Sequence, residues 1–106
     1  MNLKIILVVS ITSIAFYSCD CNQNVSGTIL DKTTKQPIDR AYTQNANKNN
    51  DHNYSDKNGH FELQSISGGF RGCPPMDVAI TKGGYEIVTI EIENGHHDTI
   101  YLERIK

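Results

Sequence analysis

Residues 55–66 read SDKNGHFELQSI and contain a turn followed by a strand. Asn58 and Gly59 tolerate the positive backbone φ that a tight turn requires. Directly after them, Phe61 and Leu63 alternate with polar residues, which places both apolar side chains on one face of a strand. Units of this kind, in which a turn precedes a short alternating run, recur along the chain and predict an all-β fold.

Similar runs lie on both sides of this unit. Strands are expected at residues 25–30, 40–46, 60–66, 76–81, 85–93 and 97–105. About seven short antiparallel strands with turns between them are typical of a Greek-key β-sandwich, in which two sheets pack face to face.

Two stretches carry further expectations. Residues 47–53 consist of Asn, Asp, Lys and His and predict a solvated loop, because these residues have low strand propensity. Residues 85–93 carry apolar side chains on both faces, which predicts a central strand. The Asn94-Gly95 pair that follows predicts a hairpin turn.

Residues 1–18 have the composition of a secretory signal peptide. Lys4 supplies a short positive start, and residues 5–17 form an uncharged, mostly apolar run. A helix that spans a bilayer needs about 20 apolar residues, so this run is too short for a membrane span.

The signal-like segment ends at Ser18-Cys19, and a small residue directly before a cysteine resembles the bacterial lipobox. The resemblance implies a lipid on Cys19 and cleavage before it. Residues 19–24 would then form a lipidated tether and residues 25–106 the domain. Several acyl chains hold a protein stably on a membrane. We expect the bacterial cell envelope, with the outer membrane favoured over the inner and the periplasmic or surface face left open. The alternative is an ordinary cleaved signal with Cys19 free.

With Cys19 lipidated, two cysteines remain, Cys21 and Cys73. An exported chain meets an oxidising compartment, where such a pair forms a disulfide. In the loop-entropy model, a bridge across this separation stabilises the fold by about 4 kcal/mol. Two free thiols are the alternative. No Cys-x-x-Cys motif or histidine pair at ligand spacing accompanies the cysteines, so neither a metal nor a redox role is expected.

A set of short motifs follows in a fixed order along the chain: Val25-x-Gly27-x-Ile29-x-Asp31, Pro37-Ile38, Ala41, Ser55-Asp56-x-x-Gly59-x-Phe61-x-Leu63 and Lys82-x-Gly84-Tyr85. Their order and spacing resemble the carboxypeptidase regulatory-like domain, a β-sandwich of the transthyretin-like (prealbumin-like) group. The resemblance implies a non-catalytic module. In physical terms, Gly27 is expected to leave space for a neighbouring strand or ring.

The net charge and the positions of the histidines argue against two classes of function, which are nucleic-acid binding and metal binding. The chain has 10 Lys and Arg against 12 Asp and Glu, for a net charge of −2, and its basic residues are scattered singly. Nucleic-acid binding is not expected, because it needs a clustered basic face. The histidines, which are His52, His60, His96 and His97, are expected to be exposed in or beside turns. Adjacent residues on a strand point to opposite faces, so His96 and His97 would not chelate one metal together.

The sequence therefore predicts a non-catalytic envelope lipoprotein without a cofactor. Its partners would be the membrane, through the lipid anchor, and an envelope protein or glycan that the β-sandwich binds or supports. The expected contact surfaces are the Asn-rich stretch and the loop at residues 67–75, because loops on a rigid scaffold carry recognition. The alternative is a small periplasmic or surface enzyme or inhibitor with a histidine-containing loop site.

Overall fold

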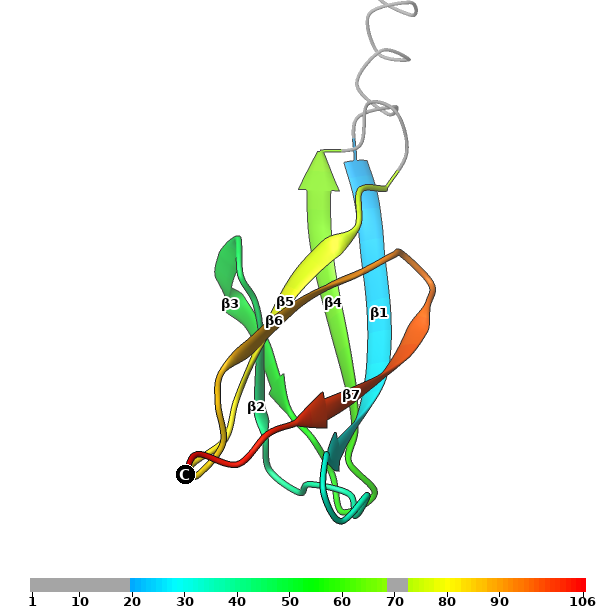
Figure 1. The fold of residues 1–106 in the computed structure, drawn as a ribbon. Coiled ribbons are helices and arrows are strands. Elements are labelled where there is room, and N and C mark those ends of the chain that lie inside the picture. Colours follow the sequence, from blue (N-terminus) through cyan, green and yellow to red (C-terminus); the bar gives the residue numbers. More distant parts are fainter. Residues whose placement is uncertain (1–19, 69–72) are drawn as a thin grey trace, which may run out of the picture.

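The computed structural model describes residues 20–68 and 73–106, which form seven strands in two sheets (Figure 1). In chain order the strands are β1 (Asp20–Asp31), β2 (Tyr42–Asn45), β3 (Lys48–Tyr54), β4 (His60–Gly68), β5 (Met76–Thr81), β6 (Val88–Ile92) and β7 (His97–Leu102). These residues contain no helix, so the predicted all-β sandwich is confirmed. The predicted signal peptide, Cys19 and residues 69–72 of the predicted contact loop lie outside the described residues.

Strands β4, β1 and β7 form one sheet in that order, and β3, β2, β5 and β6 form the other. Neighbouring strands run antiparallel except β1 and β7, which run parallel from the Ser26–His97 pair to the Asp31–Leu102 pair. The prediction of a wholly antiparallel sandwich is therefore wrong at this pair. Because β1 and β7 lie far apart in the sequence, no hairpin turn forces them to run in opposite directions.

The core lies between the two sheets and is built from alternate residues of the strands. Its most deeply buried members include Val25, Ile29, Phe61, Met76, Val78, Ile80, Ile92 and Leu102. The ring of Phe61 fills the space beside Gly27, where an added Cβ would lie 2.5 Å from Phe61 Cε1. The prediction that Gly27 makes room for a ring is confirmed.

The prediction of a loop at residues 47–53 is wrong, because most of this stretch forms β3. β3 pairs with β2, with Tyr54 opposite Tyr42. Thr43 of β2 is fully buried, and its hydroxyl donates a hydrogen bond to Asn53 O at 2.9 Å. Pairing and burial outweigh the low strand propensity of Asn and Asp here, because strand propensity depends strongly on context.

The prediction of a central strand at residues 85–93 is also wrong. Strand β6 covers only Val88–Ile92 and lies at the edge of its sheet, beside β5. Asn94 and Gly95 do form a turn, with Gly95 at a φ of 79°, but this turn connects strands of different sheets rather than a paired hairpin. The apolar side chain that suggested a second buried face, Ile87, is 70% exposed.

The first strand begins earlier than the sequence indicates. β1 starts at Asp20, so residues 20–24, expected in the tether, pair with residues 64–68 of β4. A disulfide joins Cys21 to Cys73 with a Cα–Cα distance of 5.5 Å, which confirms the predicted pairing. Because Cys73 leads into β5, this bridge connects the two sheets covalently at the end of the sandwich where β1 begins.

We expect Gly27→Ala to lower the free energy of unfolding by about 1–3 kcal/mol, because the new methyl group would overlap the Phe61 ring. Denaturant unfolding of the full-length chain, followed by circular dichroism, measures the change. Gly83→Ala is the matched control, since a Cβ at Gly83 meets nothing within 4 Å.

Phe61→Leu in the Gly27→Ala background should recover part of the lost stability, because the smaller side chain removes the overlap. Gly27→Ala stability equal to that of the wild type and of Gly83→Ala would contradict this account of the core.

Candidate functional site

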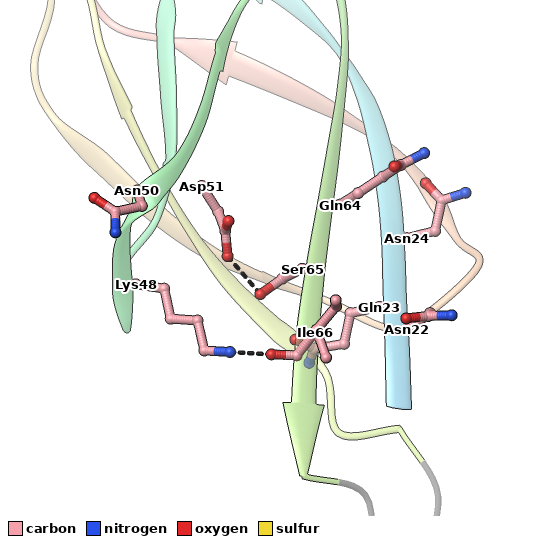
Figure 2. A pocket seen from close by; sticks show the side chains of 9 residues that line it. All are labelled: Asn22, Gln23, Asn24, Lys48, Asn50, Asp51, Gln64, Ser65 and Ile66. Atoms are coloured by element: carbon pink, nitrogen blue, oxygen red, sulfur yellow. Dashed lines mark hydrogen bonds between the residues drawn. The ribbon is translucent and has the colours of Figure 1, made fainter. Parts of the chain in front are cut away.

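Amide side chains gather in a groove of about 770 Å³ between β3, β4 and the start of β1 (Figure 2). We call it the amide groove. It is lined by Asn22, Gln23, Asn24, Lys48, Asn50, Asp51, Gln64, Ser65 and Ile66. β3 and β4 are edge strands of different sheets, so the groove lies at an open side of the sandwich.

The alternation of β1 positions one wall of the groove. Asn22 and Asn24 are exposed, whereas Gln23 between them is buried and donates a hydrogen bond from Nε2 to Pro74 O at 2.7 Å. Asn24 lies directly opposite Gln64 of β4. Residues paired in this way carry their side chains on the same face of a sheet. Two exposed amide groups therefore stand side by side at the groove.

The opposite wall comes from β3, whose side chains reach across to β4 (Figure 2). The ammonium group of Lys48 donates to Ile66 O, and the hydroxyl of Ser65 donates to Asp51 Oδ2 at 2.6 Å. Further along the same two strands, Asn53 Nδ2 donates to Glu62 O at 3.0 Å. These side chains hold the edge strands together although the strands share no backbone ladder.

The backbone of Gln64 adds a donor and an acceptor to the groove. Its partner Asn24 uses its own N–H and C=O on the other side of β1, toward Asn94 Oδ1 and Gly95 N, each at 2.7 Å. Asn24 and Gln64 therefore form a non-hydrogen-bonded antiparallel pair, in which the peptide groups of both residues point away from each other. The N–H and C=O of Gln64 consequently face the free edge of β4.

The groove thus offers alternating hydrogen-bond donors and acceptors. Amide groups supply both functions, the carboxylate of Asp51 accepts, and the ammonium of Lys48 donates. Ile66 adds an apolar surface and is 63% exposed. Such a lining suits an uncharged polar ligand that carries many donors and acceptors of its own.

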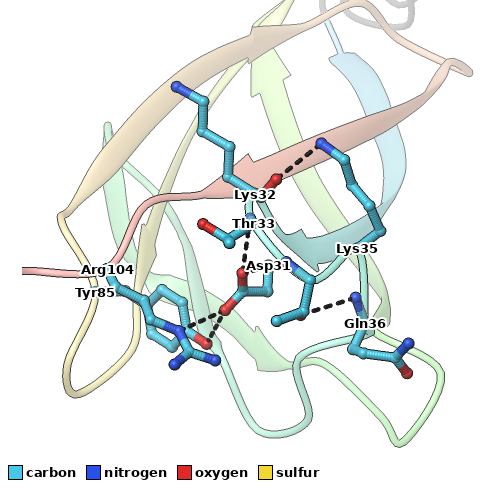
Figure 3. Close-up of polar contacts among 8 residues, drawn as sticks. Asp31, Lys32, Thr33, Lys35, Gln36, Tyr85 and Arg104 are labelled. Atoms are coloured by element: carbon cyan, nitrogen blue, oxygen red, sulfur yellow. Dashed lines mark hydrogen bonds and ion pairs between the residues drawn. The ribbon is translucent and has the colours of Figure 1, made fainter.

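A second polar cluster lies at the other end of β1, around the buried carboxylate of Asp31 (Figure 3). Asp31 Oδ2 accepts hydrogen bonds from the Tyr85 hydroxyl at 2.7 Å and from Arg104 Nε at 2.8 Å. Asp31 Oδ1 accepts from the backbone N–H groups of Thr33 and Thr34. One carboxylate therefore connects the end of β1 to the turn before β6 and to the C-terminal tail.

These hydrogen bonds stabilise the ionised form of Asp31. The N–H of Thr34, the Tyr85 hydroxyl and the Arg104 guanidinium hold the pKa of Asp31 far below its ordinary value. The hydrogen bond to Asp31 in turn raises the pKa of Tyr85, and the same carboxylate raises that of Arg104. Since every partner is used within the fold, we interpret this cluster as structural.

The structure brings together His60 and His97, a pair that the sequence patterns did not indicate. The rings of His60 and His97 stack with centroids 5.5 Å apart, on the outer face of the sheet that contains β1. His97 Nδ1 lies 2.8 Å from Ser26 Oγ, and Nε2 lies 3.0 Å from Thr28 Oγ1. Among the described residues, no group of three or more His, Cys, Asp or Glu side chains could hold a metal ion.

The structure confirms some of the site residues predicted from the sequence and leaves others untested. Cys21 and Cys73 form the expected disulfide, and Cys19 lies outside the described residues. The Asn-rich stretch does contribute to the groove, through Lys48, Asn50 and Asp51, but from a strand rather than a loop. Asn22, Asn24 and Gln64 were missed, because only their pairing across β1 and β4 places them at the same groove. Within residues 20–68 and 73–106, we find no helix with the length and hydropathy needed to cross a bilayer.

Comparison with known proteins informs the fold only. No protein-family model matches the chain, and no curated protein matches it. Among solved structures, the Bacillus anthracis TIE protein is similar at a TM-score of 0.50 and 15% sequence identity. The match covers 80% of this chain and 17% of that chain, so this chain corresponds to a small part of the larger protein. This similarity supports the assignment of the fold as a β-sandwich.

We expect Asp31→Asn to lower stability at neutral pH and the deficit to shrink in acid. The pKa of Asp31 is lower in the folded than in the unfolded chain, where it is about 3.9. The carboxylate therefore contributes fully above that value, and the contribution is lost as the pH falls below it. Urea unfolding of both proteins between about pH 7 and pH 2 measures the difference. A deficit that stays constant or grows in acid would contradict this role for Asp31.

Proposed function

We propose that this chain is a non-catalytic lipoprotein of the bacterial cell envelope whose β-sandwich binds an envelope protein or glycan through the amide groove. The signal-like residues 1–18 and the lipobox-like Ser18-Cys19 support the lipid anchor. The order of the sequence motifs supports placement among carboxypeptidase regulatory-like domains, a family of non-catalytic modules. The seven-stranded sandwich is compatible with that placement.

The observation that carries the proposal is the composition of the amide groove. The exposed amides Asn24, Asn50 and Gln64 line it from three strands, and the peptide groups of Gln64 face the free edge of β4 beside it. The side chains of these three residues make no hydrogen bond to another described residue. A few exposed polar groups along one concave surface are the usual basis of specific recognition.

The position of the groove fits a tethered protein. Asn22 and Asn24 follow Cys19 closely in the sequence, and β1 begins directly after that cysteine. The disulfide at Cys21 fixes the start of β1 to the segment before β5. A lipid on Cys19 would therefore hold the groove near the membrane surface, where it could meet components that lie against the same membrane.

We expect the combined substitution Asn24→Ala, Asn50→Ala and Gln64→Ala to weaken capture of the envelope partner by about tenfold or more. Each lost hydrogen bond contributes about 0.5–1.5 kcal/mol, and about 1.4 kcal/mol corresponds to a tenfold change in affinity. The full-length chain in detergent would be immobilised and exposed, in separate arms, to purified cell-wall glycan and to envelope proteins. Quantified retention in each arm then identifies the class of partner.

Gln36→Ala together with Asn58→Ala is the matched control, because both amides are exposed and lie in turns away from the groove. Retention should equal that of the wild type. If neither arm retains a component, or if the groove variant and the control retain it equally, the proposal is wrong.

A further inference from the structure

Three aromatic rings contact one another on the outer face of the sheet that contains β2 and β3. Tyr42 of β2 lies directly opposite Tyr54 of β3, and their ring centroids are 5.4 Å apart in an edge-on arrangement. The ring of His52 stacks on that of Tyr42 with centroids 5.6 Å apart. Thr43 is fully buried, so its neighbour Tyr42 points away from the core. We call Tyr42, His52 and Tyr54 the aromatic cluster.

The aromatic cluster is open to solvent. Tyr54 is 56% exposed, His52 is exposed and Tyr42 is half-buried. Contacts between aromatic side chains on neighbouring strands stabilise the strand pair, which accounts for the packing of the rings on one another. Single apolar side chains are common on protein surfaces, whereas exposed aromatic side chains that adjoin one another are typical of binding surfaces. The cluster is therefore a candidate binding surface as well as a stabilising contact.

Short side chains continue the same face toward β5 and β6. Residues paired across neighbouring strands carry their side chains on one face of a sheet. Two such rows begin at the cluster: Tyr54, Tyr42 and Thr81, and beside them His52, Gln44, Ala79 and Thr89. Alanine and threonine are too short to obstruct a ligand that lies flat along a row. Neighbouring strands are about 4.8 Å apart, so a row from β3 to β6 is about 14 Å long.

The charge on this face favours an uncharged ligand. Neither row contains an Asp, Glu, Lys or Arg residue. In the adjoining row, Asp77 of β5 lies opposite Glu91 of β6, and these two carboxylates would repel an anionic ligand. They lie on β5 and β6 rather than beside the rings, so they would not pair with a cation bound at the rings. An uncharged ligand also avoids the cost of removing a charge from water.

We propose that the aromatic cluster and its two rows bind a neutral oligosaccharide. A sugar ring has an apolar C–H face and a rim of hydroxyl groups, which matches a tyrosine side chain with its apolar ring and polar tip. One sugar stacks on the exposed ring of Tyr54, and the sugars linked to it extend across the sheet toward Thr81. The threonine hydroxyl can donate to or accept from the sugar hydroxyls. None of the three rings lines the amide groove, so this site does not depend on the proposed function.

The test measures binding of three neutral hexasaccharides, which are cellohexaose, chitohexaose and maltohexaose, by isothermal titration calorimetry. The full-length chain is kept in a detergent without a sugar head group, because a glycoside detergent would compete for the site. We expect at least one hexasaccharide to bind saturably. Tyr54→Ala should weaken that binding at least about tenfold, because the variant loses the ring on which the sugar stacks.

Matched variants separate the role of the ring from that of the fold. Tyr54→Ile should lose binding to the same degree, although its β-branched side chain suits a strand. Tyr54→Phe should bind within about threefold of the wild type, because it keeps the ring. Tyr101→Ala removes an exposed tyrosine of the other sheet and should bind as the wild type does. The groove variant Asn24→Ala, Gln64→Ala should also bind normally, so this proposal and the proposed function can fail independently.

The proposal is wrong if none of the three hexasaccharides binds, or if Tyr54→Ala and Tyr101→Ala both bind as the wild type does. It is also wrong if a proline-rich peptide binds the aromatic cluster and the sugars do not. That result would assign the rings to a protein partner, since aromatic surfaces also bind extended proline-rich segments. Circular dichroism of each variant establishes that the fold is retained.

Discussion

The rest of the structure depends on the pairing of β1 along both of its edges, with β4 on one side and β7 on the other. Three points fix this strand. Cys21 bridges its start to the segment before β5, Gly27 lets the Phe61 ring into the core, and Asp31 binds the turn before β6 and the C-terminal tail. Two of these connections cross from one sheet to the other, one at each end of β1. A small domain buries a limited core, so such connections contribute a large share of its stability.

The same arrangement leaves four strand edges uncovered in pairs, β3 with β4 and β6 with β7. Natural proteins protect exposed edges with charged or polar side chains, because an unprotected edge pairs with other chains. β3 and β4 follow this rule, since Lys48 and Asn53 bond to carbonyl groups of β4. The opening between β6 and β7 is instead lined largely by apolar side chains, those of Ile87, Val88, Ile90 and Ile100.

Much of the fold follows from local sequence. Alternation at residues 60–66 and 76–81 corresponds to β4 and β5, and the smallness of Gly27 correctly indicated a ring beside it. Three features were predicted wrongly, and each depends on contacts between residues far apart in the sequence. They are the strand formed by the Asn-rich stretch, the edge position of β6, and the parallel pairing of β1 with β7. The candidate site likewise depends on contacts that local sequence does not show. The Asn-rich stretch was expected to carry contacts, but Asn24 and Gln64 become neighbours only through the register of β1 on β4. Asp31 and Tyr85 belonged to the recognised motifs, whereas nothing local marked Arg104 as their partner.

The central claim is that an envelope-anchored chain carries a sandwich whose first strand is covalently fixed directly after its lipid. The intact mass of the membrane-extracted protein, measured with and without reduction and thiol alkylation, tests this most directly. The account predicts a chain that starts at Cys19 and carries acyl mass, with Cys21 and Cys73 unreactive until they are reduced. An unlipidated chain in which both thiols react without a reductant would contradict it.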